Sequence, residues 1–151
     1  MHYGHLARIL HWCTDQAITR ALEEMDLTSA QGHIMGYLAH RKRPACARDI
    51  EEEFHLSHPT VSGLLSRLEK KDFIRILPDE NDRRCKRIHV CPKGQECQEN
   101  MHQVIQNNER RLLTGFTEEE QQQFADFLTR AIVNMGASPF RKPIHKEENS
   151  Q

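Results

Sequence analysis

Residues 57–92 read SHPTVSGLLSRLEKKDFIRILPDENDRRCKRIHVCP, and this stretch decides the fold. Its first half predicts a helix with one buried face, because apolar residues recur at three- and four-residue spacing: Val61, Leu64, Leu65 and Leu68. The other side of this helix is polar and carries Thr60, Ser62, Ser66 and Arg67. Pro59 suits the first turn, and we expect Ser57 or His58 to cap the free amide groups there.

The second half of the stretch predicts a β-hairpin. Residues 73–77 read as a strand that Pro78 ends, residues 79–82 supply turn chemistry, and Ile88 and Val90 alternate along the return strand. Four cations lie close to the turn: Arg83, Arg84, Lys86 and Arg87. A helix with a free polar edge, followed by a hairpin with a basic tip, is typical of a DNA-reading helix and its wing.

Two segments, DIEEEFHLSHPTVSGLLSRLEKKDFI (49–74) and DENDRRCKRIHVCPKG (79–94), resemble the winged helix-turn-helix of the MarR family of bacterial transcription regulators. Asp72 stands where that family usually has Gly or Asn, and Val90 and Cys91 replace its usual Leu-Thr. Asp can adopt the left-handed conformation that ends a helix, so the first change is compatible with the fold. The resemblance implies a mainly α fold with a small β-wing, in which terminal dimerisation helices flank the DNA-binding core.

The functional interpretation places the polar helix edge in the major groove and the wing in the minor groove of double-stranded DNA. The helix candidates are Ser57, His58, Thr60, Ser62 and Arg67, and Lys86 joins the wing candidates. The family resemblance assigns Arg84 to the minor groove, with Asp82 positioning it and Arg83 on a phosphate. A winged helix used only for protein contacts is the alternative, but such a wing would not need so many cations.

The flanking segments predict helices that a second copy of the chain covers. We expect one domain over residues 1–136, with support and dimerisation helices at 5–40 and 92–136, the winged core at 46–91, and a flexible tail at 137–151. Capping boxes at Thr28–Gln31 and Thr117–Glu120 open two of these helices. The last helix has the most apolar face in the chain: Phe124, Phe127, Leu128, Ala131, Ile132 and Met135. This face and the first helix could pack on each other within one chain, but we expect a second copy to cover them in a homodimer, which the resemblance also implies.

Charge and cysteine content restrict the class of protein. The formal net charge is −1 over 151 residues, so bulk charge does not attract the chain to DNA. Residues 58–93 instead carry nine Lys and Arg against five Asp and Glu, whereas residues 94–138 carry three against seven. One face is therefore basic. Without a long apolar run or a signal peptide, we expect a cytoplasmic protein that binds no membrane, and its five irregularly spaced cysteines predict free thiols.

The sequence predicts regulation rather than catalysis. We expect no cofactor and no metal, because Cys85, His89 and Cys91 lack zinc-site spacing, and we expect no enzyme, because nucleophile and phosphate-loop motifs are absent. A ligand- or oxidant-responsive repressor of a palindromic operator fits best, and sensing by a metal or by the Cys13 thiol stays open. The candidate lining of a small-molecule effector pocket is His11, Trp12, His33 and Tyr37.

Overall fold

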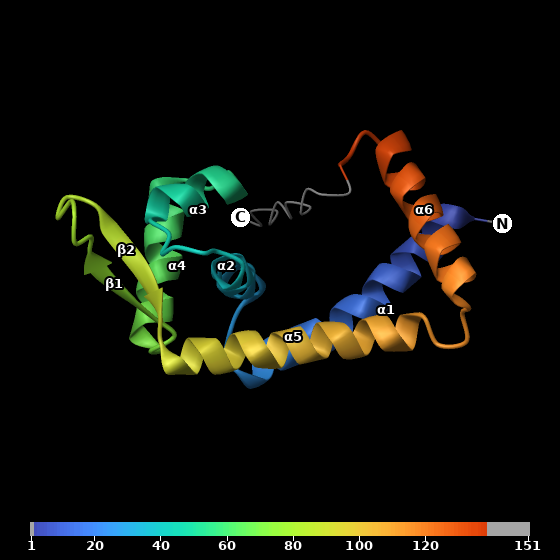
Figure 1. The fold of residues 1–151 in the computed structure, drawn as a ribbon, viewed down its shortest axis with the longest axis horizontal. Coiled ribbons are helices and arrows are strands. Elements are labelled where there is room, and N and C mark those ends of the chain that lie inside the picture. Colours follow the sequence, from blue (N-terminus) through green and yellow to red (C-terminus); the bar gives the residue numbers. More distant parts are fainter. Residues whose placement is uncertain (1, 139–151) are drawn as a thin grey trace, which may run out of the picture. The chain divides into compact units, whose positions relative to one another are not determined.

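The computed structural model describes residues 2–138 (Figure 1). Six helices and two strands follow one another in the order α1 (Tyr3–Glu24), α2 (Ser29–Ala39), α3 (Ala47–Phe54), α4 (His58–Lys70), β1 (Ile74–Pro78), β2 (Lys86–Val90), α5 (Pro92–Leu112) and α6 (Glu118–Asn134). This order confirms the mainly α fold with a small wing. The chain forms two compact units, residues 1–108 and 109–151, and each is considered by itself. Residues 139–151 of the expected flexible tail lie outside the described part.

The wing is an antiparallel hairpin in which Ile74 faces Val90 and Pro78 faces Lys86. Asp72 ends α4 in the left-handed conformation (φ 63°), as predicted, and turns the chain into β1. A third segment joins the sheet at one point, where the N–H of Ile88 donates to the carbonyl oxygen of Ala45 at 2.8 Å. This bridge, which the sequence does not predict, attaches the loop before α3 to the outer edge of β2.

The core of the first unit explains why α4 presents its polar side outward. The four apolar residues predicted to form the inner face of α4 are all buried, Val61 and Leu68 completely. They pack in one cluster with residues of α2 and α3, the base of the hairpin and the start of α5, including Ile34, Met35, Ile50, Phe73, Ile74 and Cys97. Full burial of such side chains contributes about 1.5–3 kcal/mol each, so rotating α4 to expose them would be costly.

Helix α5 leaves the base of the wing through a close backbone contact. A Cβ atom on Gly94 would lie 2.3 Å from the carbonyl oxygen of Phe73, so only glycine fits there without a shift. Gln98 Nε2 then donates to the carbonyl oxygen of Met35 at 2.9 Å. Further along, Asn108 Nδ2 donates to the carbonyl oxygen of Thr14 at 2.7 Å, which holds α5 against α1 (Figure 1).

The caps predicted for α2 and α6 are present, whereas the cap predicted for α4 is not. Both boxes are present, with Thr28 and Thr117 accepting from the N–H groups of Gln31 and Glu120. The expectation that Ser57 or His58 caps α4 is wrong, because neither side chain reaches a free amide. The Ser57 hydroxyl is instead hydrogen-bonded to the Thr60 hydroxyl at 2.9 Å, and the ring of His58 is bound elsewhere.

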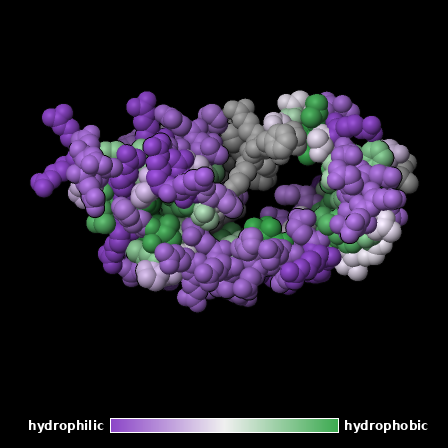
Figure 2. All heavy atoms as spheres, viewed as in Figure 1, coloured by the Kyte–Doolittle hydropathy of each residue, from purple (hydrophilic) through white to green (hydrophobic). Residues whose placement is uncertain are grey.

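The second unit, described over residues 109–138, exposes apolar surface. None of the residues of α6 is buried, and large apolar side chains stay open to solvent: Phe127, Leu128, Ile132, Val133 and Met135. Figure 2 shows hydrophobic residues reaching the surface in this region. Gly136, at φ 78°, follows the end of α6 as predicted. Among the helices described, none is long and apolar enough to cross a membrane.

Candidate nucleic-acid interface

The five helix residues expected to contact DNA lie together on the outer side of α4. Ser57, His58, Thr60, Ser62 and Arg67 are all exposed. Their direction follows from the buried face, because residues that alternate with the leucines at helical spacing must point away from the core. Arg67 forms no ion pair with any residue of the described chain, so its guanidinium is available to a phosphate.

The loop at the tip of the wing is organised by Asp79. One carboxylate oxygen, Oδ1, accepts from the N–H groups of Asn81 at 2.8 Å and Asp82 at 3.2 Å. The other, Oδ2, accepts from Nε of Arg87 at 2.6 Å. Backbone bonds close the loop, since the Asp79 N–H donates to Cys85 and the Cys85 N–H donates to Asp82. The side chain of Asp79 is only 17% exposed, so it acts as the internal support of the tip.

Arg87 differs from the other three wing cations because it is paired with Asp79. Hydrogen bonding to Arg87, followed by the two backbone N–H donors, lowers the pKa of Asp79, and the bond to Asp79 raises the pKa of Arg87. Arg87 was expected to be one of four cations presented together at the tip, and this is wrong. Its charge is neutralised inside the hairpin because the strand register, with Leu77 opposite Arg87, brings it over Asp79.

The remaining cations are presented outward. Arg83, Arg84 and Lys86 are exposed and make no ion pair within residues 2–138. The Asp82 carboxylate accepts from the backbone N–H of Arg84 at 3.0 Å, which fixes the direction of the chain at this arginine. In Figure 2 the tip of the wing, at the left edge, is hydrophilic. Three exposed positive charges at the tip of one hairpin suit a polyanion.

A contact that sequence reasoning missed joins the two helices of the helix-turn-helix. Glu51 Oε1 of α3 lies 2.6 Å from Nδ1 of His58, the first residue of α4. No periodicity or motif marks such a pair, because it depends on the turn between the helices. His55 makes that turn in the left-handed conformation, at φ 52°.

The four expected effector residues come from two helices of the first unit. His11 and Trp12 lie on α1 and are exposed, Trp12 at 60%, while His33 and Tyr37 lie on α2. Tyr37 packs against α3. Its hydroxyl accepts from Nη1 of Arg41 at 2.6 Å, its ring meets Phe54 edge-on, and burial raises its pKa. Their role in ligand binding stays a prediction.

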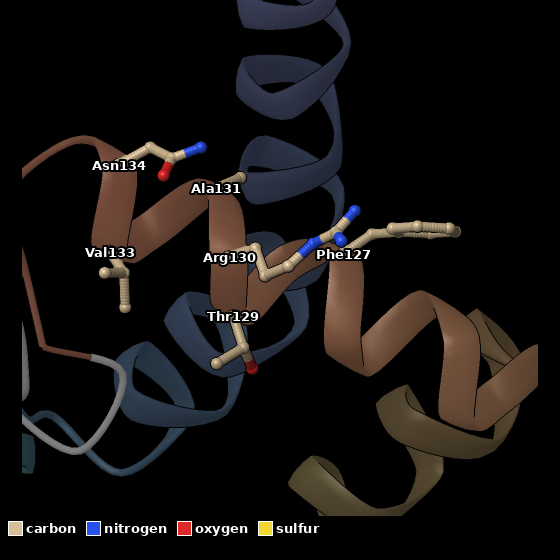
Figure 3. A pocket seen from close by; sticks show the side chains of 6 residues that line it. All are labelled: Phe127, Thr129, Arg130, Ala131, Val133 and Asn134. Atoms are coloured by element: carbon tan, nitrogen blue, oxygen red, sulfur yellow. The ribbon is translucent and has the colours of Figure 1, made fainter.

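A shallow hollow lies in the second unit and is lined by α6 alone (Figure 3). Its residues are Phe127, Thr129, Arg130, Ala131, Val133 and Asn134. The guanidinium of Arg130 lies 5.1 Å from the centre of the Phe127 ring. A hollow lined by a single helix is an uncovered surface rather than an enclosed ligand site.

The cysteines are free thiols in different surroundings. Cys13 on α1 is exposed, whereas Cys97 is buried among core residues, and this burial raises its pKa. No group of three or more His, Cys, Asp or Glu side chains is placed to hold a metal ion in the part of the chain that the structure describes.

Comparisons with known proteins agree with this geometry. A sequence model described as the MarR family matches residues 25–84. The uncharacterised HTH-type transcriptional regulator YwaE of Bacillus subtilis is 30% identical over 88 residues, which are 58% of this chain. The chain spans about half the length of this relative, 52%.

Solved structures extend the similarity to nearly the whole chain. MepR of Staphylococcus aureus in complex with DNA is 32% identical, with a TM-score of 0.75, and the match covers 88% of this chain and 99% of that one. MepR bound to ethidium bromide is also 32% identical, with a TM-score of 0.72, and covers 89% and 97% of the two chains. The similarity therefore includes the terminal helices as well as the winged core.

Proposed function

Because the chain belongs to the MarR family, we propose that it is a homodimeric transcription regulator that binds a palindromic operator in double-stranded DNA. The observation that carries this proposal is the basic wing beside the exposed edge of α4. Arg83, Arg84 and Lys86 are exposed and have no ion-pair partner among the described residues, while Arg87 is used to hold the loop in shape. A surface built for a neutral or cationic partner would not gather three exposed positive charges at the tip of one hairpin.

Helix α4 and the wing have different roles in the proposed recognition of DNA. The hydroxyls of Thr60 and Ser62 are short and exposed on α4, as reading of base edges in the major groove requires. Arg84 is carried by a loop fixed through Asp79 and Asp82, so it can enter a narrow minor groove and respond to DNA shape. Arg83 and Lys86 would then neutralise phosphates.

A second copy of the chain is the partner that the terminal helices need. Exposed apolar residues occur on α1 (Tyr3, Leu6, Ile9 and Trp12) and on α6 (Phe127, Leu128, Ile132 and Val133). Single proteins rarely leave such faces uncovered, and two-fold pairing would place two α4 helices in successive major grooves. The expected single domain of residues 1–136, with dimerisation helices on both sides of the winged core, is part of this proposal.

Regulation by a small molecule is the remaining part of the proposed function. One solved structure of MepR has ethidium bromide bound, and the match to that structure covers 89% of the present chain. A ligand bound near His11, Trp12, His33 or Tyr37 would act by favouring one separation of the two α4 helices over another. Repression is the sign of regulation that we propose, with release of DNA when the effector binds.

Selection of bound duplexes from a random pool tests this function. We expect a palindromic product whose half-sites lie about ten base pairs apart. Light scattering on the same preparation should give the mass of a dimer. If no duplex is enriched above a pool incubated without protein, the winged helix is a protein-interaction module instead. Enrichment of a single, non-palindromic site by a monomer would refute the two-fold arrangement.

A further inference from the structure

The contact between Glu51 and His58 has a chemical consequence for recognition. A carboxylate only accepts hydrogen bonds, so the 2.6 Å contact requires the proton on Nδ1 of His58. The carboxylate of Glu51 is 23% exposed, whereas His58 is 74% exposed. Glu51 on α3 is therefore largely shielded from solvent, whereas His58 at the start of α4 is exposed to it.

The neighbouring charges leave this pair intact. Arg48 precedes Glu51 by one turn and would compete for its carboxylate. Its Nε instead donates to Glu52 at 2.8 Å. His58 Nε2 makes no hydrogen bond with any residue that the structure describes, so this nitrogen faces solvent. In the neutral ring Nε2 carries a lone pair, because the proton is held on the other nitrogen.

We propose that Glu51 is a positioning residue for DNA recognition, which holds His58 by Nδ1 so that Nε2 accepts a hydrogen bond from a base edge. This inference rests on the proposed function. The first residues of a recognition helix contact base edges, and His58 is the first residue of α4. In the major groove the amino groups of cytosine and adenine are the donors that fit an acceptor, so His58 favours these bases at one position of each half-site.

Without Glu51 the ring would lose both its direction and its tautomer. A neutral imidazole in water exchanges its proton between the two nitrogens, and an Nε2–H group would meet the cytosine or adenine amino group as a second donor. Glu51→Ala is therefore expected to lower discrimination at this base pair by about tenfold, within the range typical of one mismatched base pair. Glu51→Gln keeps an acceptor oxygen and should retain most of the discrimination.

The experiment combines binding with a spectroscopic reading of the ring. Affinities are measured for the selected operator and for single-base variants at about pH 8, above the ordinary titration range of imidazole. His58→Ala identifies the base pair concerned. Glu53→Ala is the matched control, since it removes another carboxylate from α3 and should leave discrimination unchanged. Two-bond proton–nitrogen spectra of histidine-labelled free protein then report which nitrogen of His58 is protonated.

Three results together support the inference. Glu51→Ala loses discrimination at the base pair that His58→Ala identifies, the double variant is no worse than His58→Ala, and the spectra show Nδ1–H in the wild type but not in Glu51→Ala. A uniform loss of affinity on all sequences would reduce Glu51 to a structural residue and overturn the inference, as would an Nε2–H tautomer in the wild type. If the wild type binds no duplex, the proposed function fails, while the spectra still test the pair.

Discussion

Replacing Arg84 with alanine should change how DNA affinity depends on salt. Arg84 is exposed and has no ion-pair partner within the described chain, so its charge is available to release a counterion from DNA. Each neutralised phosphate contributes about 0.9 to the slope of log affinity against log salt, and a dimer carries two copies, so the slope should fall by about 2. Each wing has three such cations, Arg83, Arg84 and Lys86, and a dimer has two wings. Together they can contribute at most about 5 to the slope of log affinity against log salt.

This change of slope converts into a measurable difference in affinity. Between about 50 and about 200 mM salt, the wild type should lose roughly tenfold more affinity than Arg84→Ala. Fluorescence anisotropy with a labelled operator measures both slopes directly. Arg75→Ala is the control, because Arg75 is an exposed arginine on β1 that is already paired with Asp72 at 3.2 Å. Its loss should leave the slope unchanged.

The same variants separate shape recognition from simple charge. If Arg84 enters the minor groove, its loss should weaken binding most on operators with A·T-rich flanks, where the groove is narrow and its potential more negative. An equal loss on A·T-rich and G·C-rich flanks would make Arg84 an ordinary phosphate contact. An unchanged slope would refute the placement of the wing on DNA.

Further expectations concern the scaffold of the first unit. Gly94→Ala should destabilise the fold by about 1–3 kcal/mol in chemical denaturation, because the new methyl group meets a backbone carbonyl. Gly63 has open space around it, so Gly63→Ala should stabilise α4 by about 0.5–1 kcal/mol. Equal effects of the two substitutions would contradict the close contact at Gly94. The pKa of Asp79 is lowered in the folded wing, so the ionised carboxylate stabilises the fold. This stabilisation is complete above the ordinary pKa of a free aspartate and is lost as the pH falls through the lowered value. Amide protection in the wing should therefore decrease in acid, and a wing that responds to acid equally in Asp79→Asn would contradict this. Iodoacetamide should label Cys97 only after unfolding, because this thiol is buried and its pKa is raised; rapid native labelling of Cys97 would show that its site is open.

The elements that the sequence predicted are those with a local signal. The buried face of α4 repeats at helical spacing over about two turns, and the base of the hairpin alternates, so both could be assigned without tertiary information. Thr28 and Thr117 open helices through capping boxes that are visible in four residues. Asp72 ends α4 because a short polar side chain tolerates positive φ, and the structure places it there.

The missed features depend on contacts between elements. The pair of Asp79 and Arg87 requires the exact hairpin register, which the sequence does not specify when turn residues and cations are adjacent. Glu51 and His58 meet only because the turn at His55 brings α4 back to α3. A single bridging residue such as Ala45 has no periodicity at all. Ser57 had the right residue type for a cap, but its hydroxyl is bonded to Thr60.

Hydroxyl-radical footprinting of the selected operator tests the central claim most directly, because it reports where a helix and a wing meet DNA on both halves of a duplex. Two-fold pairing of winged helices should give a symmetric pattern. We expect two central protections about ten base pairs apart, flanked on the outer side by minor-groove protections that disappear in the Arg84→Ala variant. A footprint without two-fold symmetry, or outer protections that persist without Arg84, would contradict the account.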